Sequence, residues 1–222
     1  MTHKLKLQSN DPITPDTYML TFDKPANFDF EPGQAAELFL DKGGLRDEGR
    51  PFTMTSLPQD ATLQFVIKTY PERNGITQHI PTLAEGDDVT LDGPFGAISD
   101  QGAGTFIAAG AGITPFIPIL KKHAAEGVGE DMLVFSNHTE ADIILKKTWD
   151  AMPELETKYI VTGQENTDHT SGKIDKEMLR DMVEIDDRPV YICGPGGFVD
   201  DVRSALKELG KDESKIITED GW

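Results

Sequence analysis

Cysteine is almost absent from this sequence, and its scarcity excludes several kinds of structure. Among 222 residues the single cysteine is Cys193, so the chain can form no internal disulfide and bind no four-cysteine iron–sulfur cluster. Long apolar runs are also missing. The longest, residues 105–120, is interrupted by glycines and prolines and is shorter than the roughly 20 residues of a membrane-spanning helix. The first residues lack the apolar core of a signal peptide, and we therefore expect a cytoplasmic protein.

Basic residues are scarce beside acidic ones. The chain has 21 Lys and Arg against 39 Asp and Glu, a formal net charge of −18. Such a charge argues against nucleic acid or an anionic membrane surface as a partner. Hydrophobic residues make up 37% of the chain, which is enough for ordinary cores. The length suits two domains of about 100 residues each.

The first hundred residues consist of short apolar segments separated by turn residues. Strands are predicted at residues 5–8, 18–22, 36–40, 52–56, 63–68 and 89–91. Six strands at this spacing indicate an antiparallel barrel or sandwich. A helix is expected near residues 76–83, where apolar residues recur at helical intervals.

Beyond residue 101 the pattern changes to alternating strands and helices. Strands are predicted at residues 105–109, 132–136, 158–162, 190–193 and 215–218, and helices at 115–125, 141–151, 176–183 and 197–209. This alternation indicates a parallel sheet covered on both faces. We therefore predict an N-terminal antiparallel β-barrel over residues 1–100 and a C-terminal α/β domain over residues 101–222.

A glycine-rich turn, Gly110-Ala111-Gly112-Ile113-Thr114-Pro115, connects the first strand of the second domain to a helix. Glycines let the backbone approach a pyrophosphate, and a helix N-terminus attracts an anion. The dinucleotide-binding fingerprint is incomplete, because the third glycine is missing and the second strand ends in Ser136-Asn137 instead of an acid. A purely structural turn stays an open alternative.

A similar turn, Cys193-Gly194-Pro195-Gly196-Gly197, follows a later strand. The carboxyl ends of parallel strands lie at one edge of the sheet, where ligands bind. Two such turns at one edge favour a nucleotide site. In the alternative interpretation the glycines only turn the chain, and Cys193 is a small buried hydrophobic residue.

The run Arg50-Pro51-Phe52-Thr53 begins a strand of the first domain. Arg50 is suited to pair with phosphate, Phe52 to stack on a planar ring, and Thr53 to hydrogen-bond a ring nitrogen. Taken singly, each of them is better explained as an ordinary strand residue.

Four segments in this order resemble the ferredoxin–NADP reductase superfamily, and the resemblance covers nearly the whole chain. They are Arg50-Pro51-Phe52-Thr53, Asp92-Gly93-Pro94-Phe95-Gly96, Gly110-Ala111-Gly112-Ile113-Thr114-Pro115 and Cys193-Gly194-Pro195. The family fold is a flavin-binding antiparallel barrel followed by a nicotinamide-nucleotide domain. This agrees with the change of pattern near residue 100.

The resemblance implies where a flavin binds. Arg50 would meet its phosphate, Phe52 its isoalloxazine, and Thr53 the region of its N5 atom. The family's phosphate-binding motif falls on Asn74-Gly75-Ile76-Thr77, with Thr77 at a helix N-terminus. Here the chain departs from the pattern, because Asn74 stands where the family has a glycine.

The resemblance also implies a second set of residues, for the nicotinamide nucleotide. Gly110, Gly112, Thr114 and Pro115 would receive it, together with Ser136 at the end of the second strand. Cys193, Gly194 and Pro195 would lie near the nicotinamide. Glu219 would place a carboxylate beside the flavin, and Trp222 would cover the isoalloxazine. A solvated Glu219 and a surface position for Trp222 are the alternatives.

The expected function follows from these residues. A bound flavin, FAD rather than FMN, accepts hydride from NADH or NADPH and passes electrons to a small redox protein or an oxygenase component. NADH is the expected donor, because Ser136-Asn137-His138 offers no fixed positive charge for a 2′-phosphate, unless Lys173 or Arg180 reaches in. The alternatives are a reductase of free flavin and a non-catalytic nucleotide-binding module.

The negative net charge also bears on the electron acceptor, because it repels an acidic carrier at long range. We therefore expect either a local basic patch or an acceptor that is not strongly acidic. The residues suggested for such a patch are Arg73, Lys121, Lys122, Lys146 and Lys147.

Overall fold

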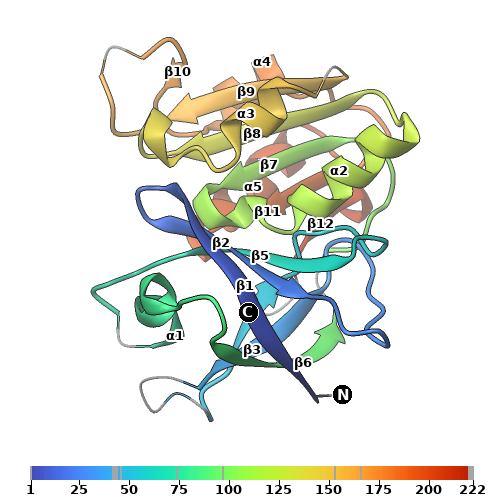
Figure 1. Ribbon diagram of the computed structural model, residues 1–222. Coiled ribbons are helices and arrows are strands. Elements are labelled where there is room, and N and C mark those ends of the chain that lie inside the picture. Colours follow the sequence, from blue (N-terminus) through green and yellow to red (C-terminus); the bar gives the residue numbers. More distant parts are fainter. Residues whose placement is uncertain are drawn as a thin grey trace.

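The computed structural model describes residues 2–41, 45, 47–73, 75–96, 98–152, 154–165 and 167–219. Asn74 and Trp222 lie outside the described residues, so the expectations for them stay predictions. The described chain forms a β-barrel and an α/β domain that lie against each other (Figure 1). The division at residues 1–100 and 101–222 stays a prediction, although the last strand of the barrel ends at Phe95 and the first of the α/β sheet begins at Thr105.

The barrel is built from six antiparallel strands in the order β4-β3-β6-β1-β2-β5. The strands are β1 (Thr2–Thr14), β2 (Thr17–Asp23), β3 (Ala35–Leu40), β4 (Arg50–Thr53), β5 (Thr62–Lys68) and β6 (Asp88–Phe95). A bridge between Met54 and Phe65 joins the two edges of the sheet. The short helices α1 (Ile76–His79) and η1 (Ile80–Thr82, a 3-10 helix) bury Ile76 and Ile80 in the barrel core.

Strand β1 is much longer than the segment predicted for it. Its register with β2 shifts between Leu7 and Ser9 and again between Pro12 and Thr14. Such irregularities interrupt the alternation of buried and exposed side chains on which a strand prediction depends. The apolar pattern therefore fades after Gln8, although the strand continues to Thr14.

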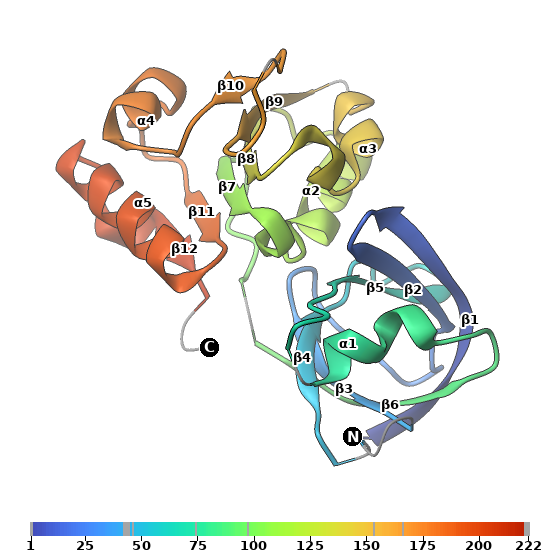
Figure 2. The same ribbon diagram turned by 90° about the vertical axis from the view of Figure 1, so that its left-hand side faces the viewer.

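The second domain is a parallel sheet in the order β10-β9-β8-β7-β11-β12. Its strands are β7 (Thr105–Ala109), β8 (Asp131–Asn137), β9 (Leu155–Val161), β10 (Thr170–Ser171), β11 (Val190–Cys193) and β12 (Ile216–Thr218). Helices α2 (Phe116–Glu126) and α3 (Lys146–Asp150) cover one face, and α4 (Lys176–Met182) and α5 (Gly196–Glu208) the other (Figure 2). The predicted fold class, an antiparallel barrel followed by a parallel α/β sheet, is confirmed.

The prediction of a single helix at residues 141–151 is wrong. The structure has a 3-10 turn, η3 (Glu140–Asp142), and then α3, separated by Leu145 in a left-handed conformation with φ of 55°. This break buries Ile143 and Ile144 against the sheet. The Trp149 indole Nε1 donates a hydrogen bond of 2.7 Å to the Ile144 carbonyl, which stabilises the broken arrangement.

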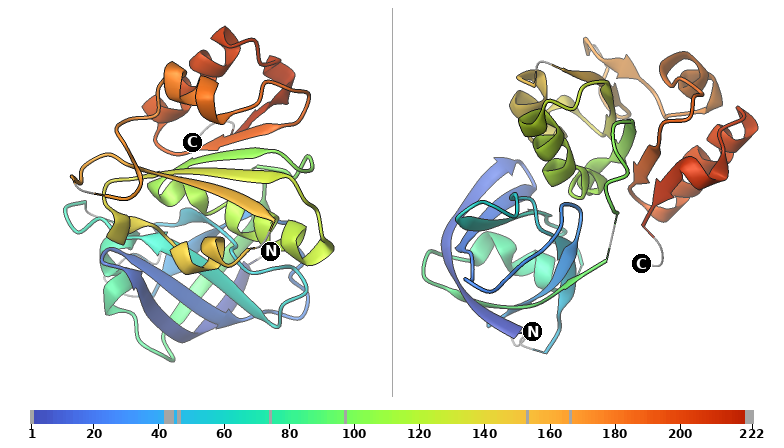
Figure 3. Two further views of the ribbon diagram at one scale, coloured as in Figure 1. Left: turned by 90° about the horizontal axis from the view of Figure 1, so that it is seen from above. Right: turned by 90° about the vertical axis from the view of Figure 1, so that its right-hand side faces the viewer.

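Helix α2 joins the two domains. Its buried apolar residues share one core with Val66 of the barrel strand β5 and with Ile98 of the connection between the domains. Lys121 of α2 donates a hydrogen bond of 3.2 Å to the Thr55 carbonyl of the barrel. In the right-hand view of Figure 3 the yellow-green part of the chain, which includes α2, lies next to the blue barrel. Within the described part of the chain, no helix has the length and apolar character needed to cross a membrane.

Candidate functional site

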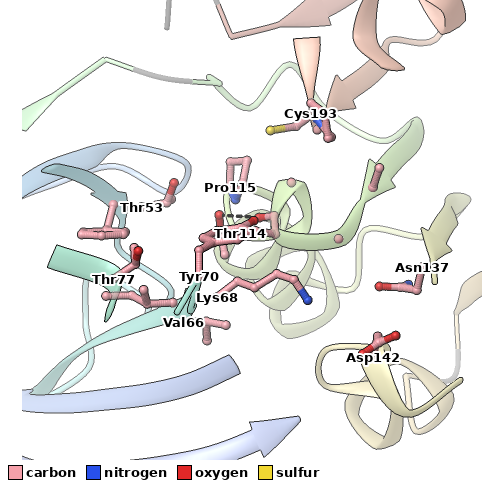
Figure 4. Close-up of a pocket in the computed structure, with 18 of the residues that line it drawn as sticks. Thr53, Val66, Lys68, Tyr70, Thr77, Thr114, Pro115, Asn137, Asp142 and Cys193 are labelled. Atoms are coloured by element: carbon pink, nitrogen blue, oxygen red, sulfur yellow. Dashed lines mark hydrogen bonds between the residues drawn. The ribbon is translucent and has the colours of Figure 1, made fainter. Parts of the chain in front are cut away.

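A cavity of about 890 Å³ lies between the two domains, and we call it the interdomain cavity. The barrel contributes residues of β4, β5 and α1 to its wall, and the α/β domain contributes the carboxyl ends of β7, β8 and β11. Figure 4 shows Thr53 and Thr77 on the barrel side, Asn137 and Asp142 on the opposite side, and Cys193 above Pro115. A volume of this size is typical of sites for large organic ligands.

The glycine turns lie where the strand order of the sheet reverses. From β7 the chain runs outward to β8 and β9, then returns to β11 on the other side of β7. Ligands of open α/β sheets bind at such a switch point. The two turns touch, because a Cβ on Gly112 would lie only 2.2 Å from the Cys193 carbonyl oxygen. Glycine is therefore required at Gly112 for this close approach.

Helix α2 begins directly after the first turn, so its N-terminus lies beside the cavity. The turn Gly110–Ile113 is a 3-10 helix, and Pro115 is the N-cap of α2. Thr114 and Pro115 line the cavity, and the Thr114 hydroxyl donates to the Ala111 carbonyl at 2.9 Å. A helix N-terminus of this kind attracts a phosphate group.

Most of the residues singled out in the sequence lie in the wall of this cavity. They are Pro51, Phe52, Thr53, Thr77, Gly110, Gly112, Thr114, Pro115, Ser136, Cys193, Gly194, Pro195 and Glu219. The structure therefore brings the segments of both domains together around one space.

Three predicted residues do not line the cavity. Arg50 is exposed at the start of β4, and its Nη1 donates a hydrogen bond of 2.8 Å to the Gly49 carbonyl. Gly75 precedes α1 with φ of 147°. Ile76 is buried in the barrel core, so its side chain does not reach the cavity. The assignment of Ile76 to the cofactor site rests on its backbone alone.

Cys193 and Glu219 form a hydrogen-bonded pair in the cavity wall. The Cys193 Sγ donates to the Glu219 Oε2 at 3.8 Å. Burial, and then the charge of Glu219, raise the pKa of the Cys193 thiol well above its usual range. Burial also raises the pKa of the Glu219 carboxyl group. The thiol is therefore a neutral hydrogen-bond donor rather than a nucleophile.

Sequence reasoning missed the ion pair between Lys68 and Asp16, and both residues line the cavity. The Lys68 Nζ lies 2.6 Å from the Asp16 Oδ2. Burial opposes ionisation of Asp16, but the hydrogen bond and charge of Lys68 outweigh it and lower the pKa of the carboxyl group. A strand that ends in lysine looks like ordinary surface in the sequence, and only the fold places this cation opposite the glycine turn.

Sequence reasoning also missed the aromatic residue Tyr70. Its side chain lines the cavity and is 36% exposed, and the Arg73 guanidinium lies 4.9 Å from the ring centroid. The signal in the sequence is a tyrosine shortly after a predicted strand, with an arginine three residues later. The pair offers a flat apolar surface and a positive charge.

The opposite end of the cavity has a polar wall. Asn137 ends β8 and is 5% exposed, and its Nδ2 has no hydrogen-bond partner among the described residues. Asp142 accepts hydrogen bonds from the Thr139 backbone N at 2.8 Å and from the Thr139 hydroxyl at 2.7 Å. Lys173 and Arg180 are not among the residues that line the cavity. This end therefore presents a carboxylate and an amide.

These residues fit a flavin and a nicotinamide nucleotide. The barrel side offers flat apolar surface at Phe52 and Tyr70, and the glycine turns form a cradle that a Cβ would fill. The N-terminus of α2 and Lys68 suit phosphate.

Comparison with known proteins agrees with the geometry. The model of the oxidoreductase FAD-binding domain matches residues 4–99, and that of the oxidoreductase NAD-binding domain matches residues 106–204. NADH-cytochrome b5 reductase 1 of Kluyveromyces lactis is 30% identical over 79% of this chain and 68% of its own length. The chain belongs to the ferredoxin–NADP reductase superfamily. NADH-cytochrome b5 reductase 1 of Mortierella alpina is 28% identical over 97% of this chain and 77% of its own length.

Solved structures show the same fold. The cytochrome b5 reductase domain of Ulva prolifera nitrate reductase superposes with a TM-score of 0.84 at 20% identity, over 97% of this chain and 96% of that domain. The chain is an NAD(P)H-dependent flavoprotein reductase with FAD and NADH as cofactors. As a flavin-dependent NADH oxidoreductase, it passes electrons to an acceptor.

Proposed function

We propose that this reductase carries electrons from NADH through one bound FAD to a small redox protein. The observation that carries the proposal is the shared wall of the interdomain cavity, in which Phe52 and Thr53 of the barrel face the same space as Gly112 and Cys193. When bound, FAD supplies the redox chemistry: it can take up a hydride from NADH and release the two electrons one at a time to the acceptor. The protein's contribution is to hold and orient the two groups.

On the barrel side, each residue has a distinct task in the proposal. Phe52 provides the flat surface for the isoalloxazine, and the buried Thr53 hydroxyl hydrogen-bonds the edge that receives hydride. Arg50 is exposed and pairs with the flavin phosphate. Gly75 and Thr77, at the start of α1, support a second phosphate contact, as the resemblance suggests.

On the α/β side, the pyrophosphate of NADH lies at the N-terminus of α2, opposite the Lys68 ammonium. The turn Cys193-Gly194-Pro195 holds the nicotinamide. The neutral Cys193 thiol and Glu219 form a hydrogen-bonded wall there, which orients the ring and needs no proton transfer.

We assign a preference for NADH over NADPH to the polar end of the cavity. Asp142 lies there with Ser136 and Asn137. A 2′-phosphate near the Asp142 carboxylate would be repelled, whereas a 2′-hydroxyl can donate a hydrogen bond to it. The absence of Lys173 and Arg180 from the cavity wall supports the same preference.

The acceptor we propose is a small haem protein of the cytochrome b5 kind, the acceptor in the names of the relatives. The basic patch suggested by the sequence is weak support for any acidic partner. Lys121 is hydrogen-bonded within the domain contact, while Lys122 and Lys146 are paired with Asp100 and Asp150. Long-range repulsion should therefore slow reduction of an acidic carrier. The cytoplasmic location stays a prediction.

Two measurements test the proposal. The first is the visible spectrum of the purified protein after dialysis, with identification of the released flavin. Retained FAD supports the proposal, whereas loss of all flavin with rapid turnover of added flavin favours the flavin-reductase alternative. The second is the rate of cytochrome b5 reduction by NADH at rising salt. Reduction that accelerates with salt shows repulsion and counts against a strongly acidic acceptor, whereas reduction that slows with salt shows local attraction. No reduction of any small redox protein contradicts the proposed acceptor class.

A further inference from the structure

The ammonium group of Lys121 joins the two domains by a hydrogen bond. Lys121 lies in the middle of α2, and its Nζ donates to the Thr55 carbonyl of the barrel at 3.2 Å. Thr55 is 1% exposed, and its own backbone N donates to the Gln64 carbonyl at 2.8 Å. The accepting carbonyl therefore belongs to a buried and fixed piece of backbone.

Both ends of this hydrogen bond lead to the interdomain cavity. On the barrel side, Thr55 follows two residues after Thr53, which ends β4 and lines the cavity. On the other side, α2 begins directly after Thr114 and Pro115, which also line it. Because a helix moves as a unit, a shift at Lys121 moves Pro115 as well. The bond thus connects the two opposite walls of one cavity through short segments.

The packing around this bond is apolar. Leu120 of α2 shares a core with Val66 of β5, and Ile13 and Met19 of the barrel pack against the same core. Apolar packing is non-directional, whereas a hydrogen bond weakens steeply when its distance or angle changes. The apolar core therefore holds the domains together, but the hydrogen bond selects one orientation among several close ones.

A lysine at this place has a cost that an apolar residue would not have. Burial lowers the pKa of Lys121, and the charge of Asp60 offsets this effect only in part. A leucine or methionine would pack here without desolvation of a charge. What the lysine adds to the domain contact is the direction of its hydrogen bond.

We infer that Lys121 is a positioning residue for hydride transfer, because its hydrogen bond to the Thr55 carbonyl fixes the orientation of the barrel wall of the cavity relative to the α/β wall. A displacement of reacting groups by about 1 Å can slow a reaction about 100-fold. Loss of the bond should slow the transfer and leave each domain's affinity for its own cofactor intact. This inference rests on the proposed meeting of NADH and FAD in the interdomain cavity.

The first test is the rate of flavin reduction, measured without oxygen on the FAD-loaded protein at saturating NADH. Lys121→Met removes the donor and keeps the apolar stem, and Lys121→Arg keeps a donor. Lys207→Met, at an exposed lysine of α5 that pairs with Glu213, is the control. We expect Lys121→Met to be at least about tenfold slower than wild type, Lys121→Arg to regain most of the rate, and the control to be unchanged. The dissociation constants of Lys121→Met for FAD and NAD⁺ should stay within about twofold of wild type.

The second test measures the domain orientation and does not depend on turnover. Residual dipolar couplings of the oxidised, FAD-loaded wild type and of Lys207→Met should fit both domains of the structure with one alignment tensor. Those of Lys121→Met should need two.

One shared tensor in Lys121→Met overturns the inference, and so does an unchanged reduction rate or a slower rate explained by weaker binding of FAD or NAD⁺. If Lys121→Met does not fold, Lys121→Gln replaces it, because the shorter glutamine side chain cannot reach the carbonyl. A wild type whose flavin NADH does not reduce refutes the proposed function instead, and the dipolar couplings still test the role of Lys121.

Discussion

The Cys193 Sγ and the Glu219 Oε2 lie 3.8 Å apart in the wall of the interdomain cavity. Burial and the Glu219 charge hold the pKa of the thiol above its usual range. We therefore predict that Cys193 reacts slowly with iodoacetamide at pH 7. Glu219→Gln removes the negative charge but not the burial, so the alkylation rate should rise and yet stay below that of a free thiol.

The alkylation rate against pH, followed by mass spectrometry, checks this prediction. Because the chain has one cysteine, every label is at Cys193. Glu213→Gln, at a surface carboxylate that pairs with Lys207, is the control and should leave the rate unchanged. Rapid alkylation of the wild type at pH 7, or no acceleration in Glu219→Gln, would contradict the electrostatic account. Saturating NAD⁺ should protect the thiol.

A second prediction concerns Arg50. If it pairs with the flavin phosphate, Arg50→Ala should lose about 1.5–3 kcal/mol of binding free energy, which is about 10- to 150-fold in the dissociation constant. Quenching of flavin fluorescence during titration of the apoprotein measures that constant. Arg180→Ala, an exposed arginine of α4 that does not line the cavity, is the matched control. Equal flavin affinity in both variants would remove Arg50 from the flavin site.

The third prediction concerns Asp142 and the preference for NADH over NADPH. Asp142→Asn removes the charge and keeps an oxygen that can accept from Thr139, so the turn should persist. The ratio of kcat/KM for NADPH to that for NADH should rise about tenfold. Asp175→Asn is the control, because Asp175 caps α4 by accepting from the Met178 backbone N at 2.8 Å and does not line the cavity. A ratio that changes alike in both variants refutes the role of the charge.

Much of this architecture was accessible from the sequence, for a physical reason. The apolar runs of β7 and β11 are buried on both faces, and the glycine turns after them mark the carboxyl edge of a parallel sheet. Those local signals sufficed to bring Gly112 and Cys193 to one site. The bounds of β1 and the break at Leu145 were not accessible, because bulges and a left-handed residue leave no periodic signal.

The missed site residues have a different cause. Lys68 and Asp16 meet only because β5 and the β1–β2 hairpin are neighbours in the barrel. In the sequence, Asn137 is informative only because it carries no charge. Its unpaired amide becomes visible only when the carbonyls and hydroxyls around it are in place.

The fourth prediction concerns stability and pH. His123 of α2 is buried between two carboxylates, with Nδ1 2.7 Å from Asp131 and Nε2 3.0 Å from Asp100. Lys122 also pairs with Asp100, at 2.9 Å. Burial alone would lower the pKa of His123, but Asp131 and Asp100 outweigh it and raise the pKa. The cluster fixes the connection between the domains to α2.

A raised histidine pKa stabilises the folded state where the ring is charged. The contribution is complete below the ordinary histidine value of 6.5 and is lost as the pH rises through the higher pKa of the folded protein. Urea unfolding of the wild type should therefore show a free energy of unfolding that falls on the alkaline side. His123→Ala leaves the buried Asp131 carboxylate with only the Gly104 backbone N–H as a partner and Asp100 with Lys122, and should cost about 3 kcal/mol at pH 6. A wild type whose stability is flat from pH 6 to pH 9 would contradict this account.

The central claim is that NADH and FAD meet in the interdomain cavity, and anaerobic reduction tests it most directly. The FAD-loaded protein is titrated with NADH without oxygen while the visible absorption of the flavin is recorded. The account predicts bleaching that is complete at one equivalent of NADH and is slower by at least tenfold with NADPH. A protein that retains FAD and binds NAD⁺, and whose flavin nevertheless stays oxidised with excess NADH, would contradict it.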